Sequence, residues 1–121
     1  MKKIFVSKES DLADGARQLV REGELEIGVY RRGAALVAYR NLCVHQGGPA
    51  CEGITMHKVV EVIRPDKTSA GLRFDMNEEH IVCPWHGVEY ELKTGACVAD
   101  KKRKLKKYEV VTEEGNIYVL A

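Results

Sequence analysis

An all-β fold, built as a sandwich or barrel of short antiparallel strands, is the fold class that the sequence predicts. Short apolar runs rich in valine, isoleucine and tyrosine recur along the chain, and glycines or charged pairs separate them. The length of 121 residues suits one domain that buries its own core. We therefore expect residues 1–121 to form a single domain.

Three β-hairpins are expected, because three pairs of apolar runs are separated by residues that favour turns. The paired runs are residues 25–31 with 35–40, residues 59–64 with 72–76, and residues 108–112 with 116–120. From Leu72 to Met76 apolar residues alternate with charged ones, so the apolar side chains share one face of that strand.

One segment, residues 10–22, has a pattern that suits a helix. Gly15 lies in the middle of it, and glycine destabilises a helix interior. Residues 17–21 also suit a strand. The sequence therefore argues against a full helix here.

The charge distribution is uneven. The formal net charge is +1, which gives the whole molecule no strong attraction to nucleic acid or to a membrane surface. Residues 101–107 read KKRKLKK and carry six positive charges, so the remaining residues sum to −5. This basic run is either a solvated edge that resists aggregation or an electrostatic patch that steers an acidic partner.

The N-terminus is too polar for a secretory signal, because only Ile4, Phe5 and Val6 are apolar before polar residues resume. No stretch approaches the length of a transmembrane span. We therefore expect a cytoplasmic protein, in which cysteines are more often metal ligands or free thiols than disulfide partners.

Two short motifs combine a thiolate with an imidazole. Cys43 and His45 form a C-x-H motif, and Cys83 and His86 form a C-x-x-H motif. Both motifs lie in loops that contain glycine and proline, which let backbone N–H groups turn toward a bound anion such as sulfide. Thiolates and imidazoles are both metal ligands. Structural zinc is one possibility, although zinc sites usually pair two cysteines two to four residues apart.

These motifs resemble those of the Rieske-type ferredoxins, in which C-x-H and C-x-x-H loops bind a 2Fe–2S cluster. CVHQGGPACEG at residues 43–53 and CPWHGVEY at residues 83–90 look like the two cluster loops of that family. The resemblance implies a Rieske-like antiparallel β-sandwich or barrel with a small cluster-binding subdomain. It also implies a ligand set, with one thiolate pair on the inner iron and one imidazole pair on the outer iron: Cys43, Cys83, His45 and His86.

Departures from the family pattern predict a low-potential protein without the disulfide that high-potential members carry beside the cluster. Trp85 stands at the second-loop position of that disulfide, and Val88 replaces a serine that donates to a cluster sulfide. Tyr90 matches a family tyrosine that can donate to a ligand sulfur. Fewer donors favour the oxidised state, so we expect the lower part of the Rieske range of about −150 to +300 mV.

The segment between the two motifs is longer than is usual in the family. It holds 37 residues between His45 and Cys83, and we place an insertion at about residues 54–80. The insertion is either a surface that selects a partner or a tolerated surface loop.

Several residues near the motifs have other expected roles. Cys51 and Cys97 are expected to be small buried residues or free thiols rather than a disulfide. His80 is expected to be a polar residue at a strand end, and His57 has no evident partner. Trp85 either shields the cluster or is exposed for docking.

The resemblance implies an electron carrier rather than an enzyme. It would carry one electron between an NAD(P)H-dependent flavoprotein reductase and a terminal oxygenase, by outer-sphere transfer through His45 and His86. No nucleic acid, membrane or small-molecule substrate is expected as a partner. A Rieske oxygenase needs a second iron site in a large domain, and a nucleotide-binding enzyme needs a glycine-rich fingerprint; the sequence contains neither.

Two alternatives to the carrier remain open. One is a Rieske subunit of a larger oxidoreductase, such as a nitrite reductase or a multicomponent monooxygenase. The other is a zinc-stabilised binding module that uses the basic run to contact nucleic acid.

Overall fold

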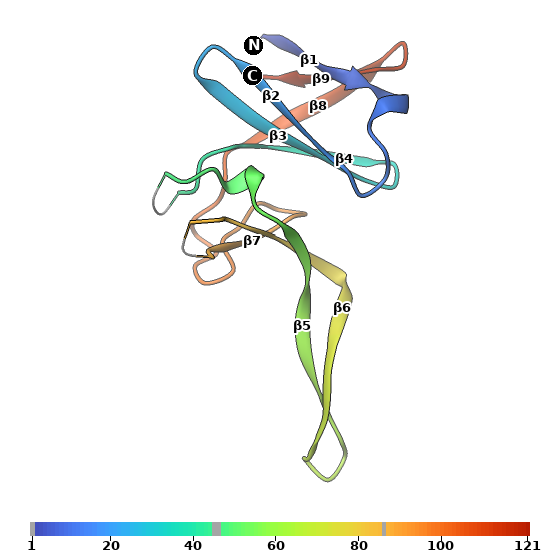
Figure 1. The fold of residues 1–121 in the computed structure, drawn as a ribbon, viewed down its shortest axis with the longest axis vertical. Helices are drawn as coiled ribbons and strands as arrows, with labels where there is room; N and C mark the ends of the chain where they lie inside the picture. Colours follow the sequence, from blue (N-terminus) through green and yellow to red (C-terminus); the bar gives the residue numbers. More distant parts are fainter. Residues whose placement is uncertain (1, 45–46, 86) are drawn as a thin grey trace.

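The computed structural model describes residues 2–44, 47–85 and 87–121, and in these ranges the chain forms two antiparallel sheets (Figure 1). The strands are β1 (Lys3–Lys8), β2 (Arg17–Glu22), β3 (Leu25–Arg32), β4 (Ala35–Arg40), β5 (Thr55–Ile63), β6 (Ser69–Val82), β7 (Glu89–Glu91), β8 (Lys107–Glu113) and β9 (Asn116–Leu120). Two short 3-10 turns, η1 (Glu9–Asp11) and η2 (Ala50–Glu52), complete the described elements. The predicted all-β fold is confirmed.

Six strands form a sheet that curls into a nearly closed barrel. Their order is β1-β9-β8-β4-β3-β2, and β1 also lies against β2. At this closure Lys2, the residue before β1, forms an ion pair with Glu22 at the end of β2. The interior holds apolar side chains from both halves of the chain: Ile4, Val6, Leu12, Ile27, Val29, Ala38, Ile117 and Val119. Burial of this apolar surface stabilises the barrel.

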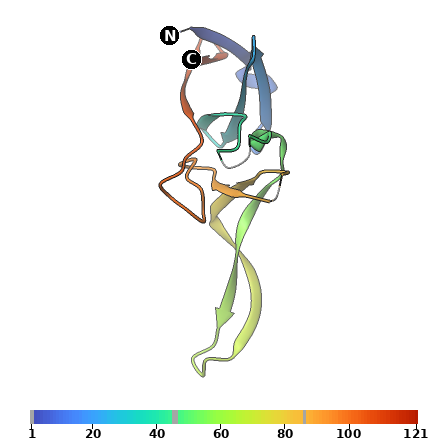
Figure 2. The same cartoon turned by 90° about the vertical axis from the view of Figure 1, so that its left-hand side faces the viewer.

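The second sheet has three strands in the order β5-β6-β7. Strand β7 pairs with β6 only at its base, where His80 to Val82 face Glu91 to Glu89. Beyond this base, β5 and β6 continue as a two-stranded ribbon that projects away from the rest of the molecule (Figures 1 and 2). We call residues 58–76 the arm.

A second core lies between the barrel and the three-stranded sheet. It contains Tyr30, Tyr39, Ala50, Ile81, Tyr90, Leu92, Leu105 and the four cysteines. Strand β3 contributes to both cores, because Val29 packs inside the barrel while Tyr30 packs in the second core. The Tyr39 hydroxyl donates to the carbonyl of Leu92 at 2.7 Å and joins β4 to the segment after β7.

The three predicted hairpins are confirmed by the strand registers β3–β4, β5–β6 and β8–β9. Residues 10–22 do not form a helix: a 3-10 turn ends at Asp11, and strand β2 begins at Arg17. Gly15 has φ +84°, a conformation that suits a turn and that other residues rarely adopt. In the part of the chain that the structure describes, no helix has the length and apolar character to span a membrane.

Candidate metal centre

The loop that carries Cys43 begins where β4 ends, and Asn41 fixes both ends of it. The Asn41 side-chain carbonyl accepts from the backbone N–H of Cys51 at 2.7 Å, and its amide donates to Glu52 at 3.0 Å. Within the loop, the Cys43 N–H donates to the carbonyl of Gly48 at 2.7 Å. These bonds hold the Cys43 backbone in place from both sides.

The loop that carries Cys83 begins directly after β6. The Cys83 N–H donates to the carbonyl of Val88 at 2.8 Å, which closes a tight turn around the C-x-x-H motif. One residue earlier, the Val82 N–H donates to the carbonyl of Ile54, the residue that follows the first loop. The two loops therefore start from neighbouring points of one sheet.

The fold brings Cys43 and Cys83 together, although 39 residues separate them in the sequence. Both are buried, with exposed fractions of 2% and 0%. Burial raises the pKa of the Cys83 thiol; the Trp85 N–H beside this sulfur opposes the shift, and the neighbouring Cys43 adds to it. Two thiols so close together and so well buried suit a metal centre, which removes their protons and neutralises their charge.

Tyr90 contacts the Cys43 sulfur directly. Its hydroxyl oxygen lies 2.9 Å from Cys43 Sγ and accepts from the Val44 N–H at 3.2 Å. Because that N–H uses an acceptor site of the oxygen, the hydroxyl proton is available for the sulfur. The structure therefore confirms the contact expected between Tyr90 and Cys43, and the hydroxyl can donate to this sulfur when Cys43 is a thiolate.

Trp85 joins the two loops. Its ring covers Gly48, where an added Cβ would lie 2.8 Å from the ring carbon Cγ. The side chain of Trp85 is nevertheless about half exposed. Trp85 therefore packs on the first loop while about half of its surface stays open to solvent.

The other two cysteines are buried at different places: Cys51 in the first loop, and Cys97 beside Tyr90 after β7. Among the described residues, which include all four cysteines, no disulfide forms. Cys51 and Cys97 are buried, as expected. Burial raises the pKa of Cys51 to about 11, so its thiol stays protonated at neutral pH. Gly28 makes room for it, because a Cβ there would lie 2.5 Å from the Cys51 Cβ.

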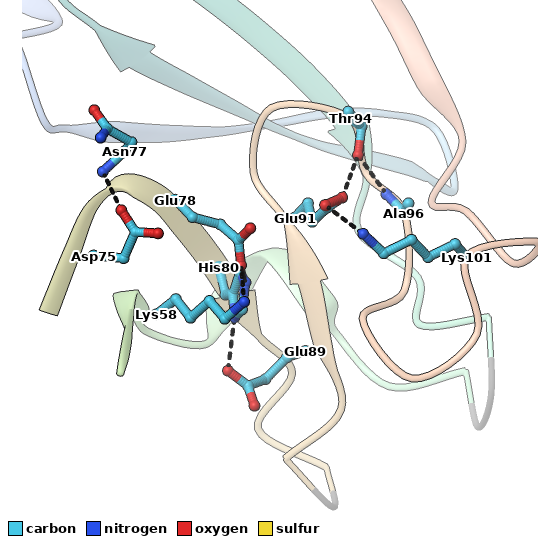
Figure 3. A network of polar contacts seen from close by, with 10 residues as sticks. All are labelled: Lys58, Asp75, Asn77, Glu78, His80, Glu89, Glu91, Thr94, Ala96 and Lys101. Atoms are coloured by element: carbon cyan, nitrogen blue, oxygen red, sulfur yellow. Dashed lines mark hydrogen bonds and ion pairs between the residues drawn. The ribbon is translucent and has the colours of Figure 1, made fainter. Parts of the chain in front are cut away.

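The sequence suggested that His80 is a polar residue at a strand end. It does lie two residues before the end of β6, but it also has a role that the sequence did not suggest. It lies inside β6, is buried, and holds both ring nitrogens against carboxylates (Figure 3). Nε2 lies 2.7 Å from Glu78 and Nδ1 lies 3.0 Å from Glu89. Lys58 reaches the same Glu78 carboxylate at 3.8 Å. This network ties β7 to β6 beside the second loop.

A second set of contacts in Figure 3 anchors the start of the basic run. Lys101 donates to Glu91 of β7 at 3.1 Å, and the same carboxylate accepts from Thr94 at 3.2 Å. The backbone of the run is also held, since the Cys97 N–H donates to the carbonyl of Arg103. These contacts hold the start of the basic run against β7, and Leu105, the one apolar residue of the run, is buried.

The expected imidazole ligands His45 and His86 lie outside the described residues. Among the residues that the structure does describe, no group of three or more metal-ligating side chains meets. The described half of the site fits a 2Fe–2S cluster: two buried thiols on separate loops, a tyrosine donor and a backbone N–H at a sulfur.

A sequence model of the Rieske [2Fe-2S] domain family matches residues 2–109. The chain belongs to the Rieske [2Fe-2S] family. Membership makes it a Rieske-type electron-transfer domain whose cofactor is a Rieske 2Fe–2S cluster. The structural-zinc alternative is therefore excluded.

Solved Rieske structures share this fold along almost the whole chain. The ferredoxin of carbazole 1,9a-dioxygenase from Nocardioides aromaticivorans IC177 is 22% identical, with a TM-score of 0.67 over 98% of this chain and 97% of that one. A complex of reduced oxygenase and oxidized ferredoxin in carbazole 1,9a-dioxygenase contains a chain 26% identical, with a TM-score of 0.68 over 97% and 91%.

A third solved structure comes from a different system. The E. coli protein NirD is 14% identical, with a TM-score of 0.67 over 98% of this chain and 96% of that one. At this identity the likeness shows the fold alone. No curated protein sequence matches the chain.

Proposed function

We propose that this Rieske domain, spanning residues 1–121, is a diffusible one-electron carrier between an NAD(P)H-dependent flavoprotein reductase and a terminal oxygenase. The observation that carries the proposal is the meeting of the buried Cys43 and Cys83 thiols beneath the hydroxyl of Tyr90. We assign the cluster ligands as Cys43, His45, Cys83 and His86. When bound, the cluster supplies reversible one-electron oxidation and reduction.

The chain's own residues then have defined tasks. Cys43 and Cys83 would hold the cluster from the buried side as thiolates, and Tyr90 would stabilise negative charge on Cys43 by donating a hydrogen bond. Trp85 would exclude water from the first loop at Gly48, while about half of its surface remains open to solvent. The likeness to a ferredoxin chain solved in complex with its oxygenase supports a protein as the electron acceptor.

A second candidate role is a subunit of a larger oxidoreductase, because the fold is shared with NirD and with a protein described as a nitrite reductase small subunit. In that case the protein would be held permanently by a large subunit. The basic run and the half-exposed Trp85 would then form part of a fixed contact.

Three measurements test the proposal. Iron and acid-labile sulfide analysis, with absorption and electron paramagnetic resonance spectra, should show one Rieske cluster per chain. The protein should be reduced by NADH with a flavoprotein reductase of an aromatic-ring dioxygenase, and reoxidised by the oxygenase component. Failure of both transfers with an intact cluster would contradict the carrier role, and copurification with a stoichiometric large subunit would favour the second candidate.

A further inference from the structure

The arm exposes an apolar face that the rest of the chain does not cover. Five large apolar side chains on it have exposed fractions from 44% to 71%: Val59, Ile63, Leu72, Phe74 and Met76. Soluble monomers seldom expose a contiguous apolar patch larger than a few hundred Å². The five side chains together present on the order of 600 Å² of such surface.

The strand register places these side chains on one side of the ribbon. Val59 faces Phe74 directly across the two strands, and Glu61 faces Leu72 two residues further along. Directly opposed residues of an antiparallel pair share a face, and so do residues two apart on one strand. Met76 and Ile63 continue this alternation at the two ends of the arm, next to irregularities in the register. Glu61 is the one charged residue among them on this face. The opposite face carries Lys58, Arg73 and Asp75 together with the half-buried Val60 and Val62.

The arm needs a cover to be stable as a ribbon. A two-stranded hairpin is at best marginally stable in water, and three or more strands or a packed apolar face are required for more. Strand β7 supports only the base of the hairpin, at residues 80–82. The apolar face therefore requires packing that the described residues of one chain do not supply.

The charges on the arm argue against a strongly acidic or strongly basic occupant. Between residues 58 and 76 the arm carries four positive and three negative side chains, so neither sign dominates: Lys58, Arg64, Lys67 and Arg73 against Glu61, Asp66 and Asp75. Redox complexes that must separate after each transfer bury little surface, commonly below about 1,200 Å² in total. A fully covered face of about 600 Å² on each partner reaches the upper limit of that range, and its apolar character is typical of lasting contacts.

We propose that a second copy of this chain covers the face, so that two arms pack face to face across a two-fold axis. Two such faces would bury roughly 1,200 Å² in total, which reaches the range of specific, stable interfaces. The same face on each copy is self-complementary under two-fold symmetry, because five apolar side chains meet five apolar side chains and Glu61 lies at an exposed strand position between Val59 and Ile63. The inference does not depend on which redox partner the protein serves.

The test is the mass of the cluster-loaded protein in solution, measured by sedimentation equilibrium over a wide range of concentration. The unmodified protein should show twice the monomer mass. The double variant L72E/F74E should weaken the dimer by about 100-fold or more, because it buries four like charges in the contact. Arg73→Glu is the matched control: it makes the same change of −2 in charge on the opposite face and should leave the dimer intact.

The absorption spectrum of the cluster reports whether each variant remains folded. A second measurement avoids charged variants: Phe74→Cys should cross-link between copies with a short bismaleimide, and Arg73→Cys should not. A protein that stays monomeric at every concentration would overturn the proposal, even if another protein proved to bind the arm. So would a dimer that L72E/F74E leaves intact, or equal cross-linking at both cysteine positions.

Discussion

The hydroxyl oxygen of Tyr90 and the sulfur of Cys43 lie 2.9 Å apart in the core between the two sheets. Burial raises the pKa of Tyr90 first, and the hydrogen bond with Cys43 raises it further, so the hydroxyl keeps its proton throughout the ordinary pH range. Tyr90 is therefore a permanent donor to a sulfur that gains negative charge on reduction.

Tyr90→Phe should lower the midpoint potential. If the bond is stronger by about 1 kcal/mol in the reduced state, the potential falls by roughly 40–50 mV. A redox titration followed by circular dichroism measures the shift. Tyr118→Phe, on β9 beside Phe5, is the control and should leave the potential unchanged. An unchanged potential in Tyr90→Phe would show that the hydroxyl does not stabilise the reduced site.

His45→Ala and His86→Ala should each remove or destabilise the cluster, because each takes away one assigned ligand. The measurement is iron content together with the Rieske absorption and electron paramagnetic resonance signals. His57→Ala is the matched control and should keep both signals, since His57 lies at the base of the hairpin and is not an assigned ligand. An intact Rieske spectrum in either of the first two variants would refute that ligand assignment.

Gly48→Ala should weaken the contact between the two loops. The added Cβ would lie 2.8 Å from Trp85, so the ring must shift at an expected cost of about 1–3 kcal/mol. In the presence of an iron chelator, the visible absorption of the cluster should therefore disappear faster in Gly48→Ala than in the unmodified protein. In a protein that already carries Trp85→Ala, adding Gly48→Ala should change the rate of cluster loss much less, because the ring that clashes with the new Cβ is gone. Strict additivity of the two substitutions would show that the contact contributes nothing.

Neutralising Lys101, Lys102, Arg103 and Lys104 to glutamine should slow electron transfer mainly at low ionic strength. The reason is that the basic run raises the encounter rate with an acidic partner, and salt screens this effect. Stopped-flow reduction rates at several salt concentrations measure it. The same number of neutralisations at the barrel end, at Lys2, Lys3, Lys8 and Arg21, is the control. An unchanged salt dependence in the first variant would show that the run is only a solvated edge.

The hairpins could be predicted from the sequence because each depends on neighbouring residues: an apolar run, turn residues and a second apolar run. The closure of the barrel could not be predicted from the sequence, because it depends on β1 lying beside both β9 and β2, which are distant in the sequence. The alternation from Leu72 to Met76 correctly predicted a shared face. Its exposure was not predictable, since periodicity does not say whether another layer covers that face.

Within the site, the sequence identified the two thiols and the tyrosine donor through paired motifs. It missed the network of His80. Glu78 lies two residues away and on the same face of β6, and this spacing is a usable signal. Glu89 comes within reach only through the register of β6 with β7, which the sequence alone does not define.

The arm also changes how the metal centre can assemble. In an unfolded chain, 39 residues separate Cys43 from Cys83, and bringing them together costs loop-closure entropy. Once the local β5–β6 hairpin has formed, Ile54 and Val82 are adjacent, and only residues 44–53 still have to close. This roughly fourfold shorter loop lowers the entropic cost by about 1.2 kcal/mol. Whenever β5 and β6 are paired, the insertion therefore shortens the loop that must close to bring the two thiols together.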